Sequence, residues 1–150
     1  MTSRWRSSRT PSGASLIARR EPAPVFYVDE SIFSKALVAA LTEAGIAFDR
    51  IGITVPSGAP DHVWLSHCGK HRYLALTRDQ RIRYRSLEKR ALMEHGVGCF
   101  TFTQGQATGE QTAGRIVELA PRMMAIAKAQ PRPFLYTFGL QAGLAKVTLR

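Results

Sequence analysis

Short apolar runs alternate with helical patterns along most of this chain, and that alternation limits the folds open to it. The first run, 25–28 (VFYV), is continuously apolar, as in a strand buried on both faces. Residues 31–45 then carry apolar side chains at helical spacing and end at Gly45. The further predicted strands cover 46–54, 73–77, 97–103 and 133–138, and the further predicted helices cover 62–71, 79–96 and 109–130.

Such an order of elements predicts an α/β domain of three layers, α/β/α, around a mainly parallel sheet of four to five strands. We expect Pro121 to kink or split the helix over 109–130. The strand over 133–138 is predicted to lie at an edge, and residues 139–150 to form a short tail. A chain of 150 residues is enough for one such domain, which we place at 25–150.

The positive charge of the chain is spread along its length. The net charge is +10, and residues 1–23 contribute five arginines against the single acid Glu21. We interpret residues 1–24, which are rich in Ser, Arg, Pro and Gly, as a disordered basic arm. The rest of the chain is basic as well, and such a charge attracts polyanions, of which nucleic acid is the commonest.

Acidic residues are scarce, yet several follow predicted strands. Asp29 and Glu30 come directly after the first strand, Asp79 comes just after the strand at 73–77, and Asp61 precedes a helix. If the first and third strands are neighbours, Asp29 and Asp79 meet at the carboxyl edge of the sheet and Asp61 can join them. Carboxylates so close together stay ionised only around a cation, and oxygen ligands favour Mg²⁺ or Mn²⁺.

A simpler interpretation needs no metal. Asp61 could be only the N-cap of its helix, and Asp79 could do no more than open the next one. For either residue alone that interpretation is preferred. The two motifs VDE and TRD together, on an α/β pattern, favour the site.

The motifs FYVDESI, PDHVWLSHC and YLALTRDQRIR resemble the PIN-like domain family. They are most similar to its small branch of VapC-type toxins, from bacterial toxin–antitoxin systems. The resemblance implies a metal-dependent endoribonuclease with Asp29, Asp61 and Asp79 as catalytic metal ligands and Thr77 in support. It also implies an acidic antitoxin as partner. A noncatalytic RNA- or partner-binding module with a degenerate site is the alternative.

PIN nucleases usually carry another acid between the first and middle ones. Glu43 and Asp49 lie in that interval without matching the motif, and Glu30 is the candidate to take its place. Beside the acids, a group of cations is predicted to hold RNA phosphates. Three of them share a face at i,i+4 spacing if 79–96 is one helix. The predicted RNA-binding residues are Arg78, Arg81, Arg85 and Lys89.

Other patterns are weaker. His67, Cys68 and His71 on one helix invite a zinc site, but no CxxC pair or acidic fourth ligand accompanies them. A phospho-accepting receiver domain would need a Lys after a late strand, and TFGLQAG has none. The apolar stripe of the helix over 109–130 is interpreted as core, with part of it a candidate homodimer surface.

The cellular setting is also constrained. Two cysteines outside any CxxC pair indicate a reducing cytoplasm. No apolar run approaches the ~18 residues of a membrane span.

Overall fold

A computed structural model describes residues 23–149 of the chain, apart from residues 54 and 80. The basic arm predicted over residues 1–24 lies almost entirely outside these described residues, so the arm and the domain boundary after it remain predictions. Within the described residues, no helix is both long enough and apolar enough to cross a lipid bilayer.

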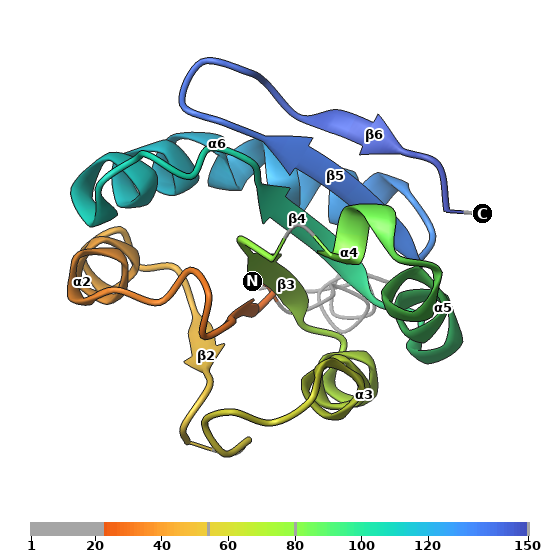
Figure 1. Cartoon of the computed structure of the whole chain (residues 1–150). Helices are drawn as coiled ribbons and strands as arrows, with labels where there is room; N and C mark the ends of the chain where they lie inside the picture. Colours follow the sequence, from red (N-terminus) through yellow and green to blue (C-terminus); the bar gives the residue numbers. More distant parts are fainter. Residues whose placement is uncertain (1–22, 54, 80, 150) are drawn as a thin grey trace, which may run out of the picture.

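The core of the fold is a six-stranded sheet with the order β2-β1-β3-β4-β5-β6 (Figure 1). All neighbouring strands are parallel except β5 and β6, which are antiparallel. The strands are β1 (Phe26–Val28), β2 (Phe48–Arg50), β3 (Leu74–Thr77), β4 (Gly98–Phe102), β5 (Phe134–Phe138) and β6 (Ala145–Val147). The central strands β1, β3 and β4 are buried throughout, which explains their continuous apolar sequences.

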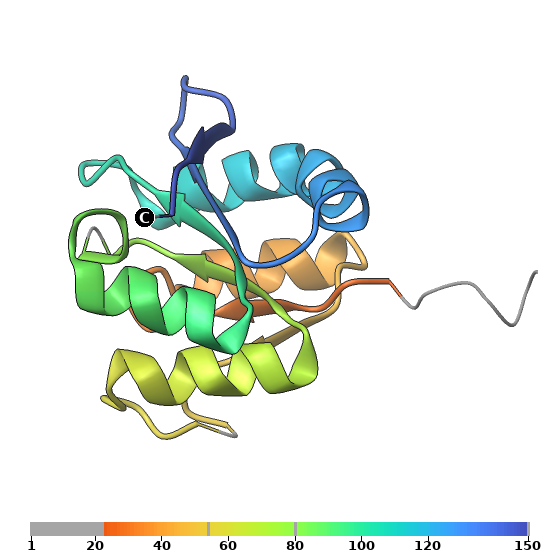
Figure 2. The ribbon, with the colours of Figure 1, turned by 90° about the vertical axis from the view of Figure 1, so that its right-hand side faces the viewer.

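Helices cover both faces of the sheet, which confirms the three-layer α/β/α class (Figures 1 and 2). Helices α2 and α6 share one apolar cluster with the sheet, and α3 and α5 share the other. The helices are α2 (Lys35–Glu43), α3 (Asp61–His71), α4 (Arg81–Tyr84), α5 (Ser86–His95) and α6 (Gly109–Ala129). The α6 stripe faces the sheet, as predicted, with Ile116 and Met123 fully buried. Cys68 and Cys99 are free and buried.

The strand order creates a switch point between β1 and β3. From β1 the chain first crosses to β2 on one side, and it then returns to β3 on the other side and proceeds outward to β4 and β5. This neighbour relation was the condition for bringing Asp29 and Asp79 together, and it is met: Val28 pairs with Leu76. In open α/β sheets, ligands bind beyond the carboxyl ends of strands at such a point.

Two predicted helices differ from expectation. The single helix predicted over 79–96 is instead divided into α4 and α5, because Arg85 has an extended backbone (φ −92°, ψ 132°). Ile82, in α4, and Leu92, in α5, are both buried in the same apolar cluster. The i,i+4 face proposed for Arg81, Arg85 and Lys89 is therefore wrong. Helix α6, in contrast, continues past Pro121 without splitting.

The two ends of the sheet also differ from expectation. The strand at 133–138 is not an edge, because residues of the predicted tail add β6 beside it. The sheet thus has one strand more than predicted. At the other edge β2 has only three residues, since the chain turns away after Arg50.

Candidate functional site

The predicted acids come from three elements that meet at the carboxyl edge of the sheet. Asp29 follows β1, Asp79 follows β3 by two residues, and Asp61 is the first residue of α3. The backbone N–H of Asp29 donates to the carbonyl of Leu76 at 3.0 Å, which ties the end of β1 to β3. The switch point therefore places these carboxylates around one short stretch of the edge.

Asp29 is the most deeply buried of the acids, with 6 % of its surface exposed. Its Oδ2 accepts hydrogen bonds from the hydroxyls of Ser31, at 2.6 Å, and Thr77, at 2.9 Å. Burial raises the pKa of Asp29 above its ordinary value, and the two hydroxyls oppose that rise without cancelling it. A buried carboxyl group with a raised pKa is typical of a functional site.

Thr77 connects the two strand ends. Its side chain is fully buried, and besides donating to Asp29 it accepts the backbone N–H of Asp79 at 3.0 Å. Ser31 has a similar position, because its hydroxyl accepts the backbone N–H of Arg78 at 2.9 Å. Ser31 was not predicted. The available signal was a hydroxyl two residues after Asp29, a spacing that commonly folds a side chain back onto a local acceptor.

Arg81 holds Asp79 and approaches Asp61. The guanidinium lies 2.6 Å from Asp79 Oδ2 and 3.6 Å from Asp61 Oδ2, and its Nε also donates to Asp79. This contact lowers the pKa of Asp79, so that carboxyl is ionised at neutral pH. The positively charged Arg81 side chain thus lies between Asp79 and Asp61, two of the predicted metal ligands.

Asp61 is not the helix cap that we expected. The N-cap of α3 is Pro60, which makes no side-chain cap, and Asp61 is the first helical residue. Its Oδ1 instead accepts the indole N–H of Trp64 at 3.1 Å. Because Trp64 is almost completely buried, this bond directs the Asp61 carboxylate from a rigid support.

The remaining acids point elsewhere. Glu30 is exposed, and its Oε1 accepts the backbone N–H of Gly58 at 2.9 Å, which links it to the loop before α3. Asp49 pairs with His67 at 3.0 Å on the α3 side of β2. Glu43 is exposed at the end of α2. Among the described residues, the structure thus gives Glu30, Asp49 and Glu43 other partners or exposed positions, and none of them contacts Asp29.

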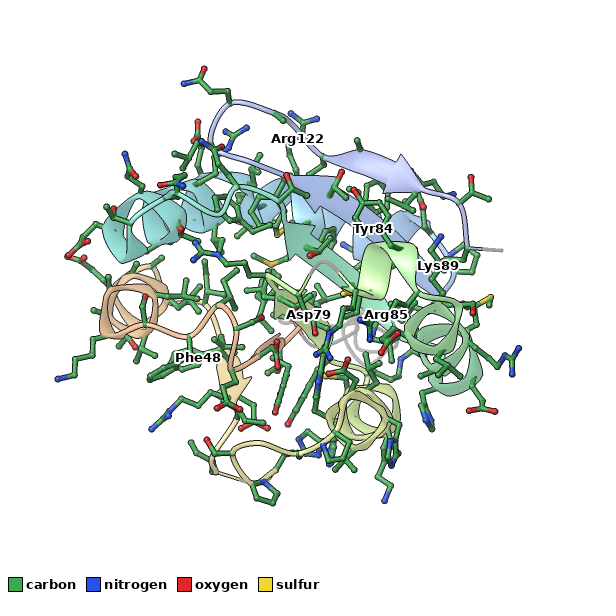
Figure 3. All side chains as sticks on the ribbon, in the orientation of Figure 1. Phe48, Asp79, Tyr84, Arg85, Lys89 and Arg122 are labelled. Carbon is green, nitrogen blue, oxygen red and sulfur yellow. The ribbon has the colours of Figure 1, made fainter. Side chains whose placement is uncertain are left out.

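The predicted RNA-binding cations divide into two groups. Arg78 points toward α6, where it donates to the Thr112 hydroxyl at 2.9 Å and lies over the Phe102 ring. Arg85 and Lys89 lie with α4 and α5 to one side of Asp79 (Figure 3). Arg85 is exposed, and its charge contributes to the lowered pKa of Asp79. Arg78 is thus held against α6, whereas Arg85 and Lys89 lie with α4 and α5.

The donor groups at the site determine which metal ion they could hold. Carboxylate and hydroxyl oxygens are the ligands that Mg²⁺ and Mn²⁺ prefer. In the part of the chain that the structure describes, however, no three His, Cys, Asp or Glu side chains are arranged to hold an ion. The acids fit by chemistry, but in this structure Arg81 pairs with Asp79 and the described acids do not form a closed set. Among the described residues, His67, Cys68 and His71 also form no metal-binding cluster.

Comparison with known proteins agrees with the fold. The family described as PIN like domain matches residues 24–104, more than half of the chain and the whole segment from β1 to β4. The chain belongs to this PIN-like domain family, whose members are commonly nucleases. No curated protein and no solved structure matches the chain. The resemblance drawn from the motifs is thus confirmed for the family, while the VapC-type branch remains a prediction.

Proposed function

We propose that this protein is a Mg²⁺- or Mn²⁺-dependent endoribonuclease of PIN type. The observation that carries the proposal is the convergence of Asp29, Asp61 and Asp79 from three elements on the switch point of the sheet. A bound ion at these acids would polarise a phosphodiester and lower the pKa of a water. Membership of a family whose domains are commonly nucleases supports the proposal.

The chain's own residues have distinct parts in this proposal. Asp29 would be the fixed ligand, because two hydroxyls orient its Oδ2 and burial holds it in place. Asp79 and Asp61 would complete the set once the half-exposed Arg81 side chain turns away from them. Arg81 could then pair with an RNA phosphate instead, since a guanidinium suits carboxylate and phosphate equally.

Cleavage of RNA by the purified chain tests the proposal. We expect cleavage with Mn²⁺, its loss on addition of EDTA, and a loss of at least a hundredfold in Asp79→Asn. Glu43→Gln is the matched control, because it removes an exposed carboxylate outside the site. Unchanged cleavage by Asp79→Asn would exclude a metal role for that residue.

We further propose that the protein is the toxin of a bacterial toxin–antitoxin pair, restrained by an acidic antitoxin. The net charge of +10 supports both an RNA substrate and an acidic partner. Induced expression should stop bacterial growth, whereas induced Asp79→Asn should not. Growth arrest that persists in the Asp79→Asn variant would contradict this role.

A second function is favoured by Arg81. Its pairing with Asp79 and proximity to Asp61 is the arrangement expected if the acids no longer bind metal. The protein would then be a noncatalytic module that binds RNA or a protein partner. Thermal melts with added Mn²⁺ separate the two functions, because an ion that binds only the native state raises the melting temperature. No rise with Mn²⁺, together with RNA binding, would favour the module.

A further inference from the structure

A hollow lies directly beside the acids, between the beginnings of α3 and α5. Its volume is about 610 Å³, and both Asp61 and Arg81 line it. It therefore opens onto the same edge of the sheet as the candidate site. A volume of this size lies within the range of small-molecule sites.

One wall of the hollow carries an unused hydrogen-bond acceptor. Glu88, in the first turn of α5, lines the hollow, and its Oε1 is buried without a hydrogen-bond partner among the described residues. The Glu88 carboxylate is also close enough to Arg81 to contribute to its electrostatic environment. Leaving a buried acceptor unpaired is unfavourable. A ligand that brings an N–H donor into the hollow would remove this cost once the half-buried Glu88 side chain turns its Oε1 toward the hollow.

The other walls suit a flat aromatic ring beside a phosphate. Leu87 leaves 71 % of its surface exposed at the hollow, and Pro60 and Ala91 add apolar surface. Arg90 supplies a further positive charge. An apolar surface for the ring, a carboxylate for its edge and cations for a phosphate are the elements of single-stranded RNA recognition.

We propose that this hollow is a nucleobase subsite and that Glu88 selects guanine at the position next to the scissile phosphate. Guanine alone among the four RNA bases presents two adjacent N–H donors, at N1 and the N2 amine, to a carboxylate. Adenine and cytosine place an acceptor beside their amine, and uracil flanks its single N–H with carbonyls. The inference rests on the proposed function, because it takes RNA as the ligand.

Binding of short RNAs to the full chain in EDTA, measured by fluorescence anisotropy, tests the subsite without requiring cleavage. The probes are uridine pentamers with guanosine, adenosine, cytidine or inosine at the centre. We expect the guanosine probe to bind about tenfold more tightly than the others. Inosine should lose most of that preference, because it lacks the N2 amine.

Two variants test whether Glu88 is the residue that produces the preference for guanine. Glu88→Gln should lose the preference for guanine and bind the adenosine probe relatively better, because an amide offers one donor and one acceptor. Glu94→Gln is the matched control, since Glu94 lines the same hollow and carries the same charge. It should keep the guanine preference. Melting temperatures of both variants check that each is folded.

Equal binding of all four probes by the unaltered chain would overturn the subsite. Retention of the guanine preference by folded Glu88→Gln would overturn the role of Glu88. Neither result depends on catalysis. A chain that prefers guanine but cleaves no RNA would refute the nuclease proposal and leave a guanine-binding hollow without a scissile phosphate beside it. A nuclease without base preference would refute the guanine subsite and leave the nuclease proposal intact.

Discussion

At the scale of single residues, two hydroxyls organise the acidic site more than any pair of charges does. Ser31 and Thr77 both donate to Asp29 and both accept backbone N–H groups from the segment after β3. They fix the geometry between β1 and β3 without adding charge. Thr77 could be proposed from the family motif, whereas Ser31 required the structure, because its contact with Arg78 spans 47 residues of sequence.

The pairing of Arg81 with Asp79 leads to a prediction about metal affinity. Arg81→Gln should bind Mn²⁺ about fivefold more tightly, equivalent to about 1 kcal/mol, since it removes a cation that competes for Asp79. Electron paramagnetic resonance of free Mn²⁺ measures this directly. Arg85→Gln is the control, because it removes a nearby charge without the bidentate contact, and its effect should be smaller. Unchanged or weaker binding by Arg81→Gln would show that Arg81 does not compete.

The burial of Asp29 leads to a prediction about stability. Its folded pKa is raised, so the native state loses stability when the group ionises, and this loss is fully present above the folded pKa. Asp29→Asn should therefore be more stable at neutral pH by about 1 kcal/mol, or ~2–4 °C in melting temperature. The advantage should shrink as the pH falls toward the ordinary carboxyl value of 3.8.

Thermal melts of both proteins at neutral pH and near pH 4 provide the measurement. The same variant should lose Mn²⁺ binding, since it removes the proposed fixed ligand. A variant that is less stable than the parent protein at neutral pH would show that the two hydroxyls compensate fully for the burial of the carboxylate.

At the scale of elements, helices α3 and α5 flank the hollow with their first turns. The packing of these two helices against each other depends on a glycine near the end of α3. A methyl group at Gly69, in α3, would collide with the backbone carbonyl of His95 at the end of α5. Gly69→Ala should cost about 1–3 kcal/mol, because backbone atoms cannot move aside cheaply. Gly114→Ala in α6, where a methyl group meets nothing within 4 Å, should instead stabilise the protein slightly. Denaturant unfolding compares the two, and equal effects would contradict a close approach of α3 and α5.

Element types followed from the sequence better than element limits. Continuous apolar runs identified β1, β3 and β4 because those strands are buried on both faces. The break at Arg85 had no local signal, since no glycine or proline marks it. The sequence likewise predicted that Glu30 and Asp61 lie near the site, but it did not predict the directions of their side chains. The direction of Glu30 depends on its hydrogen bond with Gly58, which belongs to another segment. The direction of Asp61 depends on Trp64, whose position is set by the packing of α3.

At the scale of the whole molecule, the positive charge predicts a salt-dependent association with RNA. The logarithm of the binding constant should fall linearly with the logarithm of the salt concentration. Each phosphate contact should add about 0.7 to the magnitude of that slope. Lys89→Gln and Arg85→Gln should each flatten that slope by about 0.7, equally for all RNA sequences. Lys128→Gln is the control, because Lys128 lines a different hollow, at the amino ends of the strands. A slope that changes as much in Lys128→Gln would place RNA elsewhere on the molecule.

Trp64 gives the protein an intrinsic optical reporter of its site. The indole stacks on Tyr27, with ring centroids 5.8 Å apart, and its N–H donates to Asp61. Any ligand that withdraws the Asp61 carboxylate alters the polarity around a buried fluorophore and therefore its emission. The chain has two tryptophans, and the other, Trp5, lies outside the described residues. A Trp5→Phe protein would carry a single emitter, placed one hydrogen bond from the proposed chemistry.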